Sequence, residues 1–192
     1  GAGTYEGYLF ISLDLFLGSD YQYYPSLFPQ YKYRYFRKEY IIPEAMKAYF
    51  NEKFYEEGQG NKDLLSQMVY EGKKLFFLDL MIPEAHDSLK IRYSKAQLEW
   101  CKKYEGQIWN QVLKNNDLYE TNHMKVSRYL NDGPFTNVYG IPQESSPRLG
   151  EWLGWQIVRK YAEEVKTENL VDVFAETDAQ KILVKSKYKP KI

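Results

Sequence analysis

The hydrophobic positions between residues 147 and 161 recur at the spacing of an α-helix, about 100° per residue. The apolar stripe of this helix would consist of Leu149, Leu153, Ile157 and Tyr161. Gly150 and Gly154 would lie on its flank, and Trp152, Trp155 and Arg159 would lie on another side. A glycine inside a helix costs roughly 1 kcal/mol relative to alanine. The glycine pair therefore predicts that another helix or a sheet packs very close to this face, with a direct ligand contact as the alternative.

Apolar patterns elsewhere predict one strand and several further helices. Residues 7–17 form a nearly continuous apolar run, which is typical of a strand covered on both faces, and its partner strands are expected from elsewhere. Helices are expected over residues 31–38, 43–54, 63–80 and 94–115, in a short segment at 169–174, and after Thr177. The pattern predicts an α+β fold that is predominantly α-helical with a small β-sheet.

Start and stop signals support these elements. The expected caps are Asn61 or Asp63, Ser94 with Gln97 as a capping box, and Thr177 with Gln180. Pro43 suits the first turn of its helix. Residues 131–134 read as a turn and residues 142–147 as a loop.

Composition narrows the functional classes. The chain has 192 residues, of which 44% are hydrophobic, so we expect one domain over residues 1–192 with one core. The 26 basic and 26 acidic residues give a net charge of zero, which removes the electrostatic case for binding nucleic acid or an anionic membrane surface. Because a strand-like run begins almost at once, without signal-peptide features, we expect a processed fragment lacking its N-terminal part.

Three carboxylates fall within or at the edge of apolar helix arcs: Glu71, Asp79 and Glu105. A buried carboxylate must be paired, hydrogen-bonded, bound to metal or protonated, because an isolated buried charge is too costly. Arg148 and Arg159 are the expected counter-charges. Two alternatives remain open: interior ion pairs that lock helices together, or a metal or substrate site built from the same carboxylates.

Other catalytic signatures are lacking in the sequence. The two histidines, His86 and His123, form no HExxH pair and fall in loop-like contexts, so a zinc site is not expected. The single cysteine, Cys101, excludes an internal disulfide and lies on an apolar helix face, as expected of a core residue. No nucleophile elbow, phosphate-binding loop or dinucleotide turn is present, so no cofactor is expected.

Aromatic residues offer a second kind of candidate site. Tyrosines are dense between residues 21 and 40, and they provide flat amphipathic area that suits either core packing or a glycan or peptide platform. The candidate contacts for a ligand or partner are Tyr23, Tyr24, Trp152 and Trp155.

The chain resembles the gliding-motility lipoprotein B family of Bacteroidetes, matching the C-terminal two thirds of such a protein. The resemblance lies in the segment Val69-Tyr-Glu-Gly-Lys-Lys-Leu-Phe-Phe-Leu-Asp79 and in residues 10–18, 97–101, 107–109, 130–135, 147–161 and 178–183. It implies a lipid-anchored protein on the periplasmic side of the cell envelope, made with a signal peptide and a lipidated cysteine that this chain does not contain. Association with a membrane would then occur only through that anchor.

The family is in turn similar, more distantly, to zincin-like peptidases. Glu71-Gly72 looks like their later acidic ligand, and Pro43-Glu-Ala-Met-Lys47 resembles a relic of HExxH in which Glu44 alone survives. The resemblance thus implies a degenerate zincin-like domain without a metal, in which a peptidase scaffold serves binding or assembly.

We therefore expect a non-catalytic periplasmic lipoprotein domain. It would contribute to a gliding-motility or surface-secretion apparatus through contacts with envelope proteins. One alternative is a carbohydrate- or peptide-binding module that uses the exposed aromatics. Another is a hydrolase that uses Glu71, Asp79 and Glu105 without histidine.

Overall fold

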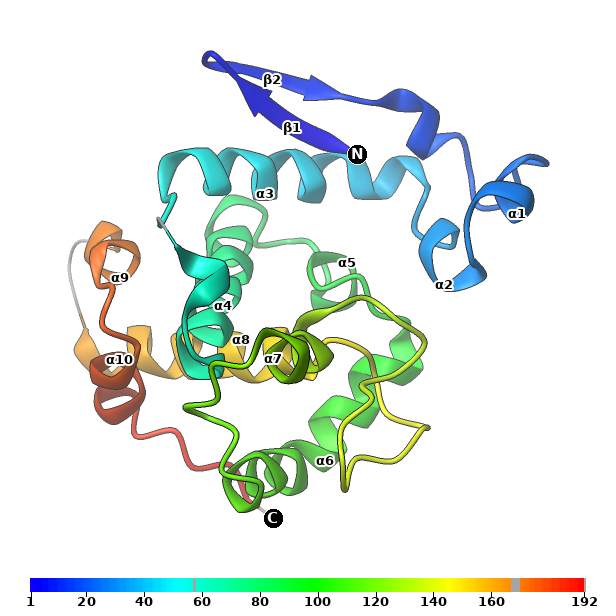
Figure 1. Cartoon of the computed structure of the whole chain (residues 1–192). Coiled ribbons are helices and arrows are strands. Elements are labelled where there is room, and N and C mark those ends of the chain that lie inside the picture. The colour runs from blue at the N-terminus through cyan, green and yellow to red at the C-terminus, as the bar shows by residue number, and fades with distance from the viewer. Residues whose placement is uncertain (57, 167–169, 192) are drawn as a thin grey trace.

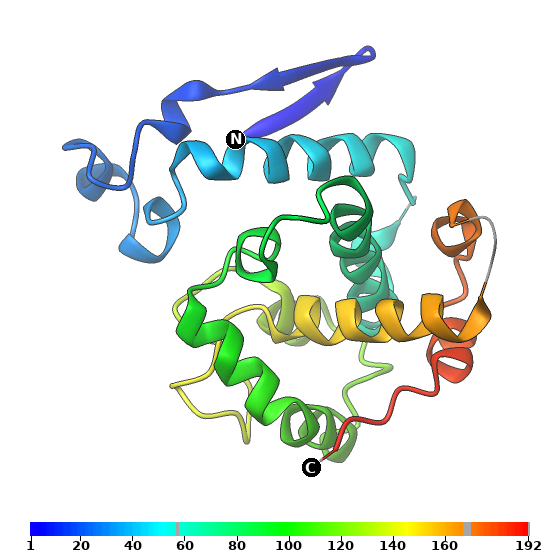
Figure 2. The same ribbon diagram turned by 180° about the vertical axis from the view of Figure 1, so that it is seen from behind.

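Two long helices, α4 (Leu64–Met81) and α8 (Leu149–Val165), cross in the middle of the molecule (Figures 1 and 2). The computed structural model describes residues 1–56, 58–166 and 170–191. Both helices contribute many buried side chains to one hydrophobic core, which also takes residues from α3 (Ile41–Lys53), α6 (Lys95–Lys114) and α10 (Ala179–Ser186). The crossing of α4 and α8 therefore positions the other helices.

The crossing is close because glycines face backbone there. A Cβ atom added at Gly154 would overlap the carbonyl oxygen of Met68, and one added at Gly72 would overlap the carbonyl group of Gly154. Gly150 lies against α7 (His123–Leu130), where an added Cβ would come within 2.7 Å of a Leu130 side-chain carbon. The prediction that another helix packs very close to the glycine flank is confirmed.

Helix starts follow the polar caps in the sequence. The Asp63 side chain accepts from the backbone N–H of Ser66 at the start of α4, and Ser94 with Gln97 forms the predicted capping box of α6. The last helix is capped by Asp178, whose carboxylate accepts from the N–H of Lys181. The prediction of Thr177 as its cap was wrong by one residue.

The N-terminal segment differs most from expectation. β1 (Ala2–Tyr5) and β2 (Tyr8–Ile11) pair antiparallel, with Ala2 opposite Ile11 and Tyr5 opposite Tyr8. The two residues between them, Glu6 and Gly7, both have positive φ, as a tight two-residue hairpin turn requires. The predicted strand covered on both faces was wrong, because β2 is only four residues long, is largely exposed and finds its partner directly before it.

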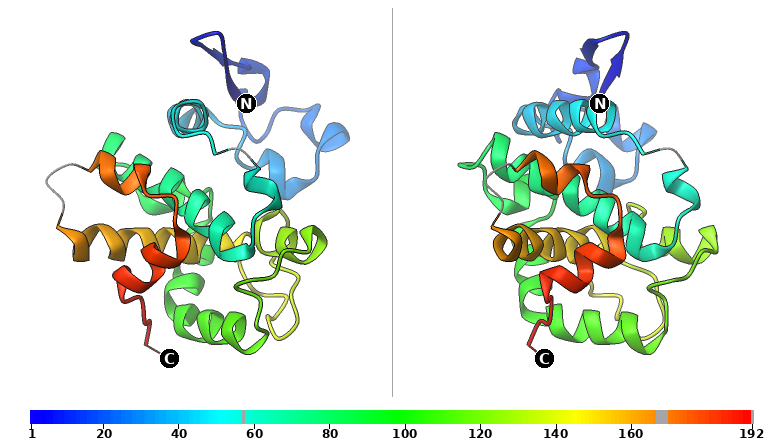
Figure 3. Two further views of the ribbon diagram at one scale, coloured as in Figure 1. Left: turned by 60° about the vertical axis from the view of Figure 1, so that its left-hand side comes forward. Right: turned by 90° about the vertical axis from the view of Figure 1, so that its left-hand side faces the viewer.

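The hairpin lies on the outer side of α3, away from α4 and α8 (Figure 3). Short elements complete the chain: 3₁₀ helices Leu13–Phe16, Lys38–Tyr40 and Gln59–Asn61, and helices α1 (Tyr24–Leu27), α2 (Gln30–Tyr33), α5 (Asp87–Lys90) and α9 (Val171–Ala175). The predicted helix over residues 31–38 is thus limited to α2, and Asn169, in the predicted start of α9, lies outside the described residues. His123, expected in a loop, opens α7.

The predicted fold class is confirmed: the described residues are mostly helical and form a small antiparallel sheet. None of the helices in the described ranges has the length and apolar character needed to cross a membrane. The similarity to zincin-like peptidases stays a prediction.

Candidate functional site

Asp79 and Arg159 meet in an ion-pair network that joins α4, α5 and α8. We call it the Asp79 cluster, and its members are Asp79, Asp87, Lys90, Trp155 and Arg159. Arg159 donates to both oxygens of Asp79, at 2.7 and 2.8 Å, and to both oxygens of Asp87, at 2.9 Å. Lys90 and the Trp155 indole N–H each donate to Asp79 at 2.9 Å. Each Asp79 oxygen therefore accepts two hydrogen bonds.

The environment of the Asp79 cluster favours charged side chains. The Arg159 guanidinium carbon lies 3.7 Å from the centre of the Trp155 ring, which adds a cation–π contact. Burial alone would raise the pKa of Asp87, but hydrogen bonds from Arg159 and its charge outweigh burial and lower that pKa. The cluster is thus a saturated link between three helices, and it leaves Asp79 no oxygen lone pair for a substrate or metal.

Arg148 has other partners. Its buried guanidinium donates to Asp132 at 2.7 Å and to the carbonyl oxygens of Ile91 and Arg92 at 2.6 and 3.1 Å. Its Nε atom lies 3.3 Å from a carboxylate oxygen of Glu151. The prediction that Arg148 offsets Glu71, Asp79 or Glu105 was wrong. Arg148 instead links the loop before α8 to the connection between α5 and α6 through these hydrogen bonds.

Glu105 lines a pocket together with Arg159, but among the described residues it forms no ion pair with either arginine. It accepts a hydrogen bond of 2.9 Å from the Tyr188 hydroxyl in the C-terminal segment, and burial raises its pKa. The Tyr188 ring packs edge-on against Trp109, 5.2 Å between centres. The three predicted carboxylates therefore occupy separate places, because the inward faces of α4 and α6 contact different neighbours.

Glu71 and Glu44, which the sequence also singled out, line one polar cavity of about 240 Å³. We call it the charged cavity, and its ionisable lining residues are Glu44, Lys47, Glu71, Lys74, Arg92 and Glu151, from α3, α4, the α5–α6 connection and α8. Lys47 lies 3.2 Å from Glu44, and Lys74 lies 2.8 Å from Glu71. Arg92 adds a longer contact to Glu44, 3.7 Å. The cavity lining therefore contains three acidic and three basic groups.

Electrostatics in the charged cavity stabilise ionised Glu44. Burial raises the pKa of Glu44, but the charges of Lys47 and Arg92 outweigh burial and bring the pKa to about 2. Burial lowers the pKa of Lys47, with Glu44 opposing it, and burial raises the pKa of Glu151. Within the residues that the structure describes, no group of three or more His, Cys, Asp or Glu side chains is arranged to hold a metal ion.

The Glu44→Gln variant is expected to show a pH-dependent loss of stability. Folding lowers the Glu44 pKa from 4.5 to about 2. The contribution of the Glu44 carboxylate to stability is therefore complete above pH 4.5 and is lost as the pH falls towards 2. The free energy of unfolding of the wild type should therefore exceed that of the variant most at pH 7, and this difference should shrink as the pH falls below 4.5. Urea unfolding at several pH values measures this, with the exposed Glu99→Gln as control. A difference that does not change with pH would contradict the assignment.

The predicted aromatic contacts are mostly buried. Trp152, Trp155 and Tyr24 are 2%, 0% and 2% exposed, whereas Tyr23 is 56% exposed. The two tryptophan rings pack edge-to-face at 6.1 Å within the core. The prediction of a ligand contact through Trp152 or Trp155 is wrong in this structure, because the crossing of α4 and α8 turns that side of the helix inward.

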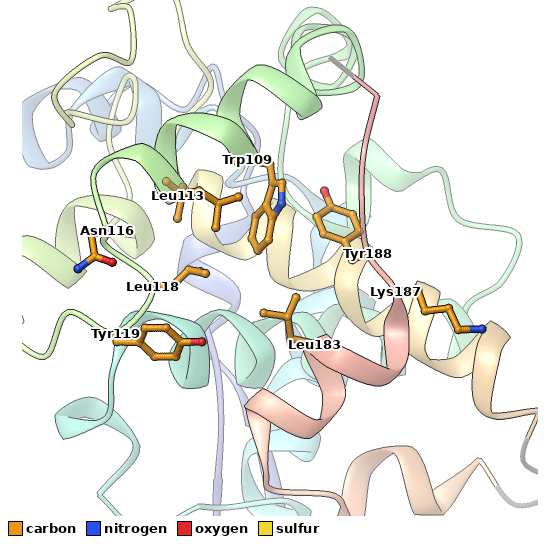
Figure 4. A pocket seen from close by; sticks show the side chains of 9 residues that line it. Trp109, Leu113, Asn116, Leu118, Tyr119, Leu183, Lys187 and Tyr188 are labelled. Atoms are coloured by element: carbon orange, nitrogen blue, oxygen red, sulfur yellow. The ribbon is translucent and has the colours of Figure 1, made fainter.

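An apolar pocket of about 390 Å³, which the sequence analysis missed, lies between α6 and α10 (Figure 4). Trp109, Leu113, Leu118, Leu183 and Tyr188 surround it. At its rim, Lys187 pairs with Glu164 at 2.6 Å. The sequence predicted helices at α6 and α10. It did not show that the two helices leave a gap between them.

The fold and these contacts define a predominantly helical protein whose interior charges join helices in ion pairs. A family model described as gliding motility protein GldB matches residues 3–190, so the chain belongs to this family. The family label marks a lipoprotein family, and membership implies a part in gliding motility. Neither the comparison with curated proteins nor that with solved structures found a match. The family resemblance predicted from the sequence is confirmed.

Proposed function

We propose that the chain is a single, non-catalytic domain that contributes to a gliding-motility or surface-secretion apparatus by contacting other envelope proteins. In this proposal it works on the periplasmic side of the envelope, where a lipid anchor holds it. Family membership supports the role in motility, and the lipoprotein label supports the anchor. The partner is then a protein of the same machinery.

The observation that carries the proposal is an exposed apolar surface at the N-terminus. We call it the N-terminal apolar surface: Tyr5, Tyr8 and Phe10 lie on one face of the hairpin and are 54% to 70% exposed, and the exposed Leu13 and Leu17 follow in the chain. Leu9, which is 44% exposed, lies on the opposite face of the hairpin. Large apolar side chains that are exposed together on one face of a protein favour an interaction site there. A two-stranded hairpin also has two unpaired edges and is marginally stable by itself, so a bound protein would stabilise it.

The ion pairs support the non-catalytic part of the proposal. Catalytic carboxylates need free oxygen atoms within reach of a substrate. Both oxygens of Asp79 are occupied, and Glu71 pairs with Lys74 on its own helix. Asp79 thereby links three helices, and Glu71 is paired within α4, so both have a structural role in this proposal.

The double variant Tyr8→Ser, Phe10→Ser is expected to abolish or strongly reduce gliding when it replaces the native protein in a gliding host. Both side chains are more than half exposed, so the fold should persist, while the contact area for a partner is lost. Colony spreading and single-cell movement measure the effect, together with the amount of protein in the envelope. The matched control is Tyr139→Ser, an exposed aromatic elsewhere on the surface. Normal gliding of the double variant would refute the proposed contact surface.

The non-catalytic part is tested separately with dialysed, purified protein. Metal analysis and a general peptidase assay should show neither stoichiometric zinc nor turnover. Stoichiometric zinc with turnover would overturn this part. The role of the N-terminal apolar surface would then be tested only by the gliding of the double variant.

A further inference from the structure

A cavity of about 530 Å³ opens between α6 and the loop over residues 140–144. We call it the aromatic–amide cavity, after the lining residues Trp100, Tyr104, Gln107, Asn110, Gln111 and Glu144. Its volume falls in the range of roughly 300–1,000 Å³ of small-molecule sites. It lies at α6, on the opposite side of the molecule from the N-terminal hairpin (Figure 1).

Specific contacts hold the wall of this cavity in place. Gln111 donates a hydrogen bond of 2.8 Å to Asn115, and Asn115 donates one of 3.2 Å to the carbonyl oxygen of Tyr139. Gly140 has a φ of 80° and packs so closely on the Gln111 amide that a Cβ would overlap it. The loop is therefore held against α6 by contacts within the chain, which reduces the ordering cost of binding.

The lining combines aromatic rings with uncommitted hydrogen-bonding groups. Trp100 and Tyr104 are half-buried, with ring centres 5.0 Å apart. The Lys103 ammonium lies over the Tyr104 ring, which makes Trp100 the more available stacking surface. In the part of the chain that the structure describes, the side chains of Gln107, Asn110 and Glu144 form no hydrogen bond with protein. Each amide can both donate and accept.

These features distinguish among ligand classes. An anion would need an excess of cations, but Lys114 and Glu144 in the lining balance each other. An extended peptide would need free backbone groups, but one wall is a helix whose N–H and C=O groups are already bonded. A purely apolar ligand would leave the amides unpaired at a cost. A sugar ring presents C–H groups on one face, which suit the negative face of an aromatic ring, and hydroxyls at its edge.

We propose that the aromatic–amide cavity binds a short neutral saccharide. Trp100 stacks on the C–H face of a sugar ring, and Gln107, Asn110 and Glu144 exchange hydrogen bonds with its hydroxyls. The site is separate from the N-terminal apolar surface and does not depend on the proposed role in gliding.

Titration calorimetry with cellobiose, maltose and N,N′-diacetylchitobiose tests the proposal on the whole chain. At least one should bind with a Kd below about 10 mM. Trp100→Ala should weaken that binding by about tenfold or more, as loss of an aromatic anchor does. Because Trp100 also contacts the core, the exposed Gln107→Ala gives a second readout and should weaken binding without affecting folding.

The matched control is Tyr119→Ala, an exposed aromatic that lines the pocket between α6 and α10, and its affinity should equal that of the wild type. The proposal is overturned if none of the three saccharides binds at about 10 mM. It is also overturned if binding survives in both Trp100→Ala and Gln107→Ala. Binding of the tripeptide Ala-Gly-Ala in place of the sugars would overturn it in favour of a peptide site.

Discussion

Replacing Gly154 with alanine is expected to lower the free energy of unfolding by about 3 kcal/mol. The added methyl group would overlap the carbonyl oxygen of Met68, and backbone cannot rotate away as a flexible side chain can. The two central helices would have to separate, which would loosen the packing along both. Alanine favours helix over glycine by roughly 1 kcal/mol, so a net loss shows that the crossing outweighs helix propensity.

Urea unfolding of the purified variant at neutral pH measures this effect. The matched control is Gly60→Ala, because an added Cβ there meets nothing within 4 Å. That variant should stay within about 0.5 kcal/mol of the wild type. If Gly154→Ala were as stable as the control, the close approach of α4 and α8 would be refuted.

Replacing Asp79 with alanine is expected to cost about 3 kcal/mol of stability, at the low end for a broken buried ion pair because Arg159 is partly exposed. The change removes four hydrogen bonds at once. Lys90, whose side chain is 4% exposed, would keep only a 3.9 Å contact with Asp87. A buried ammonium without a close partner accounts for most of the expected loss.

Two further variants separate the contributions to this loss. Asp79→Asn keeps the size of the side chain but removes its charge, so its stability should fall between those of the wild type and Asp79→Ala. Glu99→Ala removes an exposed pair with Lys102 and should have little effect, as is usual for surface ion pairs. Equal stability of Asp79→Ala and Glu99→Ala in urea unfolding would show that the Asp79 cluster does not hold the helices together.

The candidate sites show where sequence reasoning reached its limit. A helical wheel correctly placed Asp79 on an inward face, and Arg159, one of the two expected counter-charges, pairs with it. The same wheel grouped Glu105 with them, although Glu105 bonds to Tyr188, 83 residues away. A wheel gives the direction of a side chain around its own axis, but the neighbour in that direction depends on how the helices pack.

The aromatic residues show the same limit. Trp152 and Trp155 were candidates for ligand contact because they lie off the main apolar stripe, yet both are buried between helices. Trp100 was not a candidate contact residue in the sequence, yet it lines the largest of the cavities described above. In the N-terminal run, hydrophobicity predicted burial, but the residues form an exposed hairpin because Gly7 permits a tight turn directly before them.

The sequence by itself determined the long helices, most of their caps, the close approach at the glycine flank and the family. These depend on interactions between residues a few positions apart, or on motifs that can be read directly. Only the tertiary structure decided which charges pair, which aromatic rings are buried and where cavities remain. Those outcomes depend on contacts between segments distant in the chain, and such contacts are set by how all the helices pack together.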